Sequence, residues 1–285
     1  MGICQSTHIQ YLEDLKIRQA PILYVKKSPV LGMHKVYLGN LPTLDEFSHE
    51  DDQIRRASFS YNDDVIYNGQ WTRNKRNGLG ILEWGDGTYY EGNWKADEID
   101  GNGKFVSNNV VIEGQWKNNQ LNGYGIYKVD ELYKYEGYWC DDQKLGIGKE
   151  YYDDESQYIG NFDQNVKSGI GIYIWNDGSK YEGSFKQDCL NGMGELRWAN
   201  GSWYKGEFVN NYFHGQGCFQ WSDGRRYEGN YVYDYKNGYG KYFWEDNQKY
   251  EGYWKNDKWN GHGILTKSNC IIEGEWIHGK LQKVK

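Results

Sequence analysis

Residues 181–201 read YEGSFKQDCLNGMGELRWANG, and this stretch decides the fold because its frame recurs along the whole chain. A Tyr-x-Gly-x-aromatic segment is followed at a fixed distance by Gly-x-Gly, and then by Asp-Gly or Asn-Gly. The frame returns about every 23 residues, which indicates a repeat array. The copies begin at Tyr67, Tyr90, Ile112, Tyr135, Tyr158, Tyr181, Tyr204, Tyr227 and Tyr250, and a truncated tenth copy begins at Ile272.

Side chains within each copy alternate as they do in half-buried strands. We number a copy from its leading residue, so that offsets 0, 2 and 4 of one copy are Tyr181, Gly183 and Phe185. These offsets share one face of a strand, because successive side chains of a strand point to opposite faces. A second segment begins at offset 11 and carries Leu196 and Trp198 on one face. Each copy is therefore predicted to be two antiparallel strands, and consecutive copies continue one sheet.

Turn-forming residues indicate where the strands reverse. The pairs Asp177-Gly178 and Asn200-Gly201 fall between the second strand of one copy and the first strand of the next. Such pairs favour two-residue hairpins, because these tight turns need positive φ angles. The connection inside a copy, such as residues 186–191, is predicted to be longer and polar.

The glycines at offsets 2, 11 and 13 predict how the sheet packs. They have no Cβ, so they leave slots into which neighbouring Tyr and Trp rings can lie, and one layer can bury aromatic area. Relief of turn strain is the alternative explanation. It accounts for offset 11 but not for offset 2, because Gly in the middle of a strand costs roughly 0.5–1 kcal/mol. We therefore favour ring packing.

The array begins with half a copy. Phe59 and Tyr61 stand at offsets 15 and 17 of the preceding period, so residues 57–61 are predicted to form the second strand of a half-repeat. Two strands per copy at about 4.8 Å predict a twisted sheet roughly 90 Å long. The expected parts are an N-terminal arm over 1–56, an array over 57–279 of a half-repeat, nine full copies and a truncated tenth, and a C-terminal tail over 280–285.

Composition narrows the class of protein. Aromatic residues make up 17% of the chain, with 37 Gly and 3 Pro, which favours strands and tight turns. The net charge of -7 divides into +3 over residues 1–40, -5 over 41–66 and -5 beyond, which gives no electrostatic reason to bind nucleic acid. The five Cys share no spacing and are typical of reduced thiols in an intracellular protein. No membrane span or secretory signal is predicted.

The combined pattern over residues 57–279 resembles the MORN (membrane occupation and recognition nexus) repeat. Departures are mild: Ile112 and Ile272 replace the leading Tyr, and Tyr231 replaces Trp. The resemblance implies an all-β fold, an elongated, twisted single-layer antiparallel sheet of β-hairpin repeats with an aromatic groove. It also implies a scaffold or recognition module, as in junctophilins, radial-spoke-head proteins and protist cytoskeletal scaffolds.

The first six residues, MGICQS, fit the N-myristoylation pattern, with Gly2 as the acceptor. Cys4 is a candidate for palmitoylation, which matters because one myristoyl chain gives only marginal membrane binding. The alternative is an ordinary N-terminus that begins with Met-Gly. Residues 7–18 are expected to form a short helix, because Thr7 and Gln10 make a capping box.

Other candidate sites are few. The stretch Arg55-Arg56-Ala57-Ser58 resembles a basophilic kinase site and makes Ser58 a candidate for phosphorylation, with a chance match as the alternative. The six His share no metal-ligand spacing, no Ser or Cys lies on a nucleophile elbow, and the Gly-rich stretches lack the Lys-Ser/Thr of a phosphate loop. We therefore expect no catalytic site, no metal and no cofactor.

The leading hypothesis is a non-enzymatic protein-interaction scaffold, tethered by acylation to the cytoplasmic face of a membrane. An amphipathic helix or an extended peptide would bind the groove, and open strand edges allow self-association. The candidate groove residues, which could equally just hold the sheet together, are Trp175, Phe185, Trp198, Tyr204, Phe208 and Trp221. Three alternatives stay open: a structural component of a ciliary, radial-spoke-like or cortical cytoskeletal assembly, a phospholipid-binding module, and a regulatory subunit of a lipid kinase.

Overall fold

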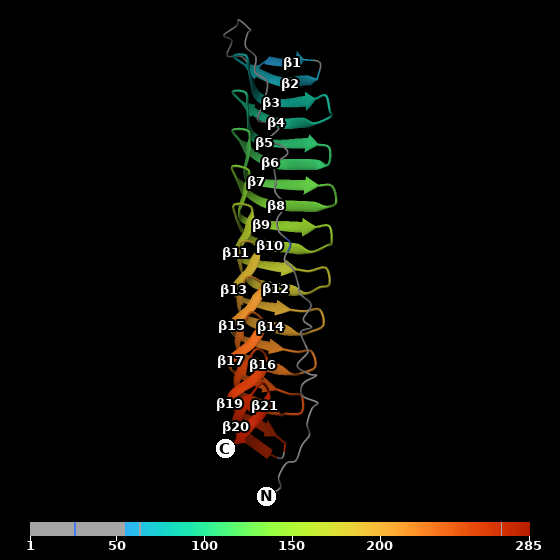
Figure 1. Cartoon of the computed structure of the whole chain (residues 1–285). Helices are drawn as coiled ribbons and strands as arrows, with labels where there is room; N and C mark the ends of the chain where they lie inside the picture. The colour runs from blue at the N-terminus through green and yellow to red at the C-terminus, as the bar shows by residue number, and fades with distance from the viewer. Residues whose placement is uncertain (1–25, 27–54, 63, 269) are drawn as a thin grey trace. The chain divides into compact units, whose positions relative to one another are not determined.

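The computed structural model describes residues 26, 55–62, 64–268 and 270–285 (Figure 1). These residues form 21 β-strands and no helix, which confirms the all-β prediction for the part of the chain described. The predicted helix over residues 7–18 lies outside the described residues, as do Gly2 and Cys4. The described residues divide into two compact units, here called the first unit (55–62 and 64–168) and the second unit (26, 169–268 and 270–285).

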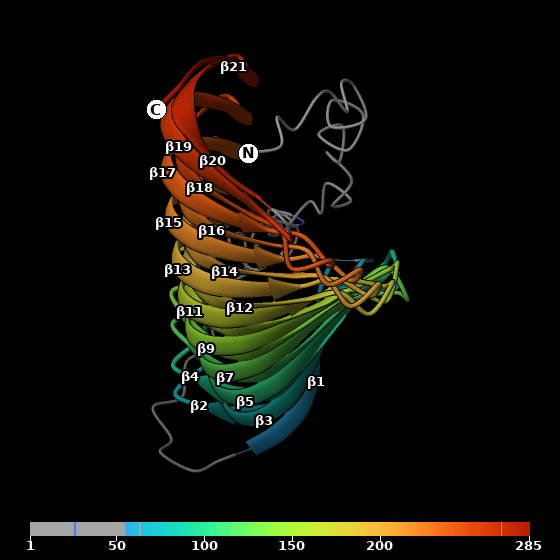
Figure 2. The ribbon, with the colours of Figure 1, turned by 90° about the horizontal axis from the view of Figure 1, so that it is seen from below.

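In the first unit each strand pairs antiparallel with the next one along the chain. Figure 2 shows these strands side by side, each bent along its length. The strands are β1 (Arg55–Asn62), β2 (Val65–Thr72), β3 (Lys75–Trp84), β4 (Tyr89–Lys95), β5 (Glu98–Ser107), β6 (Val110–Lys117), β7 (Gln120–Val129), β8 (Tyr133–Cys140), β9 (Gln143–Tyr152) and β10 (Gln157–Asp163). β1 contains residues 57–61, the predicted half-repeat strand.

The second unit repeats this antiparallel pairing from one strand to the next. Its last strand lies in the residues that were expected to form the tail. The strands are β11 (Val166–Ile174, in this unit from Gly169), β12 (Lys180–Lys186), β13 (Cys189–Arg197), β14 (Trp203–Val209), β15 (Tyr212–Gln220), β16 (Arg226–Val232), β17 (Tyr235–Phe243), β18 (Lys249–Lys255), β19 (Lys258–Lys267), β20 (Cys270–Ile277) and β21 (Lys280–Val284).

The leading tyrosines explain the glycine frame. Tyr181 is fully buried and lies over Gly183 and Gly194, which face each other across β12 and β13. A Cβ on Gly194 would lie 2.5 Å from Cζ of Tyr181, so only Gly leaves room for the ring. The Tyr181 hydroxyl donates a 2.9 Å hydrogen bond to the carbonyl of Ser184, beside a bulge in the strand. The predicted ring packing is therefore confirmed for offsets 2 and 13.

Gly at offset 11 has a different role. Gly192 has a φ of 94°, and a Cβ there would meet only the side chain of Ser184, at 3.1 Å. The left-handed backbone, which Gly adopts without steric cost, is what requires glycine at this position. The alternative based on turn strain thus holds for offset 11.

Aromatic rings link one copy to the next. The ring of Tyr67 makes edge-to-face contacts with Trp71 of its own copy at 5.0 Å and with Trp94 of the following copy at 5.5 Å. The indole N–H of Trp94 donates a 3.2 Å hydrogen bond back to the carbonyl of Gly80. The second unit shows the same ring contacts, for instance around Tyr204. The core of each unit is therefore an aromatic ladder, in which each pair of rings adds to the burial of apolar area.

The assignment of the two kinds of turn was wrong. The connection inside a copy is the two-residue turn: Gln187 and Asp188, between β12 and β13, have φ angles of 49° and 61°. The Asp-Gly connection is the longer one, in which Trp175 N–H donates to Ser179 O at 2.9 Å and Asp177 Oδ1 accepts from Ser179 N–H at 2.8 Å. The second residue of this turn is Asn or Asp in every full copy, and these residues tolerate the left-handed conformation, so the tight turn does not require Gly.

Candidate functional site

A side chain at offset 7, which the sequence patterns did not single out, fastens a copy to the preceding one within a unit. Asp257 N–H donates to the carbonyl of Lys236 at 3.1 Å, and Asp257 Oδ1 accepts from Lys236 N–H at 2.8 Å. Asn119 and Ile99 make the same pair of bonds in the first unit. The available signal was an Asn or Asp seven residues after every leading residue from Tyr67 to Tyr250.

The residue at offset 9 makes both of these bonds with its main chain. Its side chain lies on the face of the leading tyrosine ring of its own copy. Trp259 stacks on Tyr250 with ring centroids 4.2 Å apart and an interplanar angle of 5°. Four copies have a cation there instead, each within 6.0 Å of the centroid of its leading tyrosine. These cations are Arg76, Lys144, Lys167 and Lys236. One position in the frame thus accepts either an apolar side chain or a cation, which attracts the negative face of the ring.

Two of these cations lie beside the Asp at offset 7 of the following copy of the same unit. Arg76 is fully buried, and its Nε lies 3.2 Å from Asp97 Oδ1. Lys236 Nζ lies 3.9 Å from Asp257 Oδ1 and within 5.7 Å of the centroids of four aromatic rings. Burial lowers the pKa of Lys236, and the Asp257 carboxylate opposes that shift.

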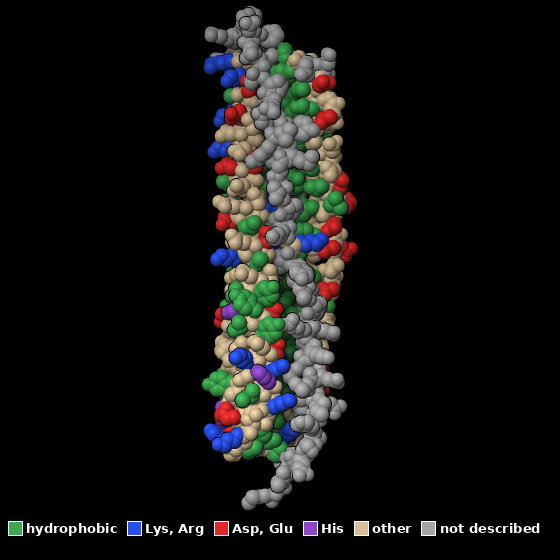
Figure 3. Space-filling model, in the orientation of Figure 1, with side chains coloured by type: hydrophobic (Ala, Val, Ile, Leu, Met, Phe, Trp, Pro, Cys, Tyr) green, Lys and Arg blue, Asp and Glu red, His purple; other side chains and the backbone are tan. Residues whose placement is uncertain are grey.

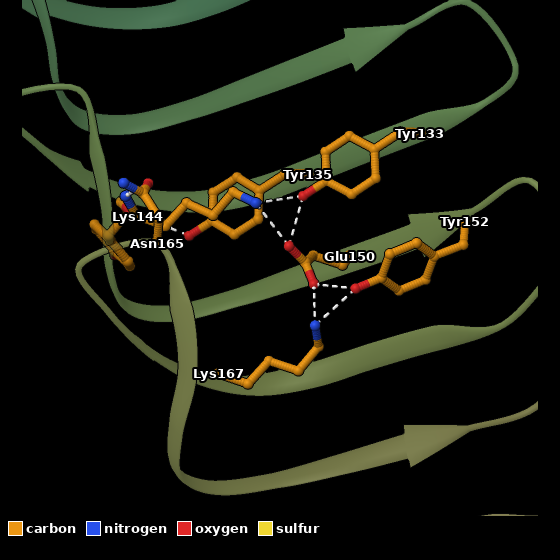
Figure 4. A network of polar contacts seen from close by, with 8 residues as sticks. Tyr133, Tyr135, Lys144, Glu150, Tyr152, Asn165 and Lys167 are labelled. Atoms are coloured by element: carbon orange, nitrogen blue, oxygen red, sulfur yellow. Dashed lines mark hydrogen bonds and ion pairs between the residues drawn. The ribbon is translucent and has the colours of Figure 1, made fainter. Parts of the chain in front are cut away.

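The other two cations belong to a buried polar cluster in the first unit, here called the Glu150 cluster (Figure 4). Lys144 Nζ lies 2.6 Å from Glu150 Oε1, and Lys167 Nζ lies 2.8 Å from Glu150 Oε2. The Tyr133 hydroxyl donates to Oε1 at 2.6 Å, and the Tyr152 hydroxyl donates to Oε2. Both lysines and the glutamate have side chains that are 0% exposed. Each carboxylate oxygen therefore holds one ammonium group and one phenol.

The repeat frame explains why an acid lies here. The main-chain N–H of Lys144 donates to Asn165 Oδ1 at 2.9 Å, so this copy has a neutral amide where Arg76 and Lys236 have an aspartate. Glu150, at offset 15, supplies a carboxylate from a position that is apolar or aromatic in the other full copies. Those residues are Leu82, Phe105, Tyr127, Tyr173, Leu196, Phe219, Tyr242 and Leu265.

The charges of the cluster stabilise one another. Burial alone would raise the pKa of Glu150, but the ammonium groups of Lys144 and Lys167 outweigh it and lower the pKa to about 2. Burial and the adjacent Glu150 carboxylate raise the pKa of Tyr133 well above its ordinary value, so its hydroxyl stays protonated and donates. The cluster is a set of saturated ion pairs rather than a matched acid and base for catalysis.

We expect acid to destabilise the first unit through Glu150. Its pKa in the folded chain, about 2, lies below the usual value for an unfolded chain of about 4.3. Its stabilising contribution is therefore complete above about pH 5 and is lost as the pH falls towards about 2. Between about pH 6 and about pH 2.5, the melting temperature of the wild type should fall more steeply than that of Lys144→Leu/Glu150→Leu/Lys167→Leu, which lacks these groups. Parallel pH profiles would contradict the assignment.

The six predicted groove residues all lie in the second unit. Five are buried, with Tyr204 at 0% and Trp175 at 7% exposure as the extremes, whereas Trp221 is half-buried. Phe185, Tyr204 and Phe208 belong to the aromatic ladder. Trp198 and Trp221 lie on either side of Phe219, at centroid distances of 5.2 and 4.4 Å. The residues thus share one aromatic face, and their role in partner binding stays a prediction.

The remaining predictions concern a phosphorylation site, metal ligands and membrane-spanning segments. Ser58 is exposed on β1, opposite Asn68 of β2, and its phosphorylation stays a prediction. Among the described residues, no group of three or more His, Cys, Asp or Glu is placed to hold a metal ion. The same part of the chain contains no helix long and apolar enough to cross a membrane.

Comparison with known proteins identifies the repeat. The family model for the MORN repeat matches nine segments that together cover more than half of the chain. This chain belongs to the MORN repeat family. The matched segments are residues 67–89, 90–109, 113–128, 135–157, 158–180, 181–203, 204–225, 227–249 and 250–269.

Other comparisons with this MORN-repeat chain carry no argument about its function. No curated protein sequence matches it. One similar solved structure is the Drosophila melanogaster SAS-4 TCP domain in complex with a proline-rich motif of Ana2, at 10% identity and a TM-score of 0.34, over 54% of this chain and 84% of that one. Another is virginiamycin B lyase from Staphylococcus aureus, at 12% identity and a TM-score of 0.15, over 79% of this chain and 85% of that one.

Proposed function

We propose that this MORN-repeat chain is a non-enzymatic protein-interaction scaffold, held at the cytoplasmic face of a membrane by acyl chains on Gly2 and Cys4. The observation that supports the scaffold function is that each copy combines constant positions, which pack the sheet, with positions that vary. The Tyr and Gly residues of the frame pack against each other, whereas half-buried side chains at offset 17, such as Val129, Trp221 and Lys267, change from copy to copy. A uniform framework with variable side chains is how repeat proteins build binding surfaces.

Trp221 is the groove residue best placed to contact a partner. It is the only one of the six candidates that is not buried. Its ring also lies near two cations, 5.3 Å from Lys236 Nζ and 5.8 Å from Arg225 Cζ. A half-exposed Trp beside cationic groups suits an amphipathic helix or an extended peptide that carries an acidic side chain.

The tether rests on the sequence of residues 1–6. Myristoylation of Gly2 alone would give weak, reversible membrane binding, and palmitoylation of Cys4 would make the attachment stable. The repeats have little need for membrane affinity of their own in this arrangement, because the acyl chains set the location and the array binds the partner.

Proximity labelling in cells tests both parts of the proposal. Gly2→Ala should abolish incorporation of labelled myristate and remove membrane proteins from the labelled set. Trp221→Ala should keep the fold, the acylation and the membrane neighbours, but lose the protein partners of the groove. Tyr253→Ala, which removes an aromatic ring that is 50% exposed elsewhere in the second unit, is the matched control. An unchanged set of neighbours for Gly2→Ala would overturn the tether, and an unchanged set for Trp221→Ala would overturn the groove.

A further inference from the structure

The tight turns of the second unit form a row in which two neighbours differ from the rest. We call residues at offsets 5–8 of a copy its tip. A typical tip is polar, as in Lys255-Asn256-Asp257-Lys258. The tips Val209-Asn210-Asn211-Tyr212 and Val232-Tyr233-Asp234-Tyr235 carry aliphatic and aromatic side chains instead, and we call these two the aromatic tips. The copies of this chain thus serve as internal controls for one another.

The aromatic tips touch each other and are exposed. The rings of Tyr212 and Tyr233 meet edge to face, with centroids 5.8 Å apart. Tyr212 is 47% exposed, Tyr233 is 54% exposed and Val232 is 39% exposed. Hydrophobic side chains appear among charged ones on the surface seen in Figure 3, and single ones need no explanation. A contacting pair of tyrosines next to an exposed valine is more informative, since tyrosine is enriched where binding energy concentrates.

The backbone of Tyr233 does not favour a bulky residue. Its φ angle is 48°, a left-handed conformation that is unfavourable for a bulky residue. The neighbouring tips have Asn210 and Asn256 at this offset, and Asn adopts this conformation readily. Gln187 has the same conformation in another tip of this unit, so the left-handed turn belongs to the frame, and among the described copies only this one has tyrosine at that offset.

A polar atom lies beside the aromatic tips without a hydrogen bond. The ring of His214 contacts that of Tyr233, with centroids 5.3 Å apart. Its Nδ1 is buried and makes no hydrogen bond to any part of the chain that the structure describes. An unsatisfied buried nitrogen is unfavourable, so the main chain of a bound peptide would gain by pairing with it.

Charge on the neighbouring tips favours an acidic ligand. Exposed Lys186 lies on one side of the aromatic tips along the chain, and Lys255, Lys258 and Lys280 lie on the other. The acids of the row are less available, because the Asp at offset 7 turns its carboxylate to the preceding copy, as Asp257 does to Lys236 N–H. The row therefore presents apolar contacts flanked by ammonium groups.

We propose that the aromatic tips bind residues 41–52 of a second copy of this chain. That segment, LPTLDEFSHEDD, carries five acids and three apolar residues spaced three apart, namely Leu41, Leu44 and Phe47. In the polyproline II conformation, which Pro42 favours, every third residue lies on the same side and about 9.3 Å further along. Neighbouring tips are two strands, or about 9.6 Å, apart. Successive apolar side chains can thus meet successive tips while the acids reach the lysines.

This interaction goes beyond the proposed function, because it needs neither the acyl tether nor the groove. It gives the scaffold a way to associate with itself through one exposed edge. Because the donor segment and the receiving tips are different surfaces, the contact is heterologous, and each copy can both give and receive a segment.

Full-length variants separate the two surfaces. Tyr212→Gln/Tyr233→Asn introduces residues that the chain already has at the same offsets, Gln120 and Asn256, so the fold should be kept. Leu44→Ser/Phe47→Ser alters only the donor segment. We expect sedimentation velocity to show concentration-dependent association of the wild type, and monomers for each variant. An equimolar mixture of the two variants should recover a dimer, because one supplies tips and the other a segment.

A labelled peptide of residues 41–52 gives the direct measurement. It should bind the Leu44→Ser/Phe47→Ser chain saturably, and at least about tenfold more weakly when Tyr212→Gln/Tyr233→Asn is added. A peptide with Asn and Gln in place of Asp and Glu should bind less, and added salt should weaken the native peptide. Absence of binding, equal affinity for the two chains, or a monomeric wild type at all concentrations would each overturn the proposal.

Discussion

Glu150→Leu is expected to destabilise the first unit by about 3–5 kcal/mol, because it removes the carboxylate between two buried cations. Lys144 and Lys167 have no exposed side-chain surface, so neither ammonium group can recover the interaction from water without opening the sheet. Leucine itself fits the position, since Leu82 and Leu196 occupy the same offset in other copies. Hydrogen exchange should show the loss of protection concentrated in β8–β10, and urea denaturation should give its size.

The matched variant is Lys144→Leu/Glu150→Leu/Lys167→Leu combined with Tyr133→Phe/Tyr152→Phe, which removes all three charges and the two hydroxyls that donate to Glu150. We expect it to unfold within about 1 kcal/mol of the wild type, or to be more stable, because burying ion pairs costs nearly as much as their attraction returns. The chain already builds this apolar solution, with Leu190 at offset 9 and Leu196 at offset 15 of one copy. If this variant is as unstable as Glu150→Leu, volume and not charge decides the effect.

This comparison bears on what the cluster contributes. If the apolar variant is as stable, the charges serve specificity: Lys144 and Glu150 belong to one copy and Lys167 to the next, so the cluster forms only when these two copies are neighbours. In an array of similar hairpins, a pairing shifted by one copy would bury an unpaired charge. A buried polar group that fixes register in this way is the best-attested role for such pairs.

The sequence predicted what the copies share and missed what depends on single copies. Alternation predicted the strands, and the Gly frame predicted that aromatic rings lie over its glycines, as Tyr181 does over Gly183 and Gly194. The tight turn was misplaced because the Asp-Gly signal is stronger in sequence than an Asn or Asp in a left-handed conformation. The Glu150 cluster was missed because the repeat pattern describes what the copies share, and Glu150 departs from that pattern in a single copy. An acid at an otherwise apolar offset was the available signal, but its partners are identified only through space.

The second prediction with a large effect tests the aromatic ladder by adding a single Cβ atom beside one of its rings. Gly103→Ala, in β5, is expected to destabilise the first unit by about 3 kcal/mol, because overpacking a filled core forces rings or backbone to move. The new Cβ would lie 2.6 Å from Cε2 of Tyr90 and closer still to its hydroxyl, and Tyr90 is fully buried. Urea denaturation of the full chain measures the loss.

Gly125→Ala is the control, because Gly125 occupies the same offset in the next copy, which begins with Ile112 instead of tyrosine. The nearest atoms to a Cβ there are the Glu113 carbonyl and the Leu121 side chain, each at 3.3 Å, so a few tenths of an ångström of adjustment suffice. We expect a loss of about 1 kcal/mol or less. Tyr90→Ile should therefore reduce the cost of Gly103→Ala by about 1–2 kcal/mol in a double-mutant cycle. Equal costs in both backgrounds would mean that strand geometry, and not the tyrosine ring, requires glycine at offset 13.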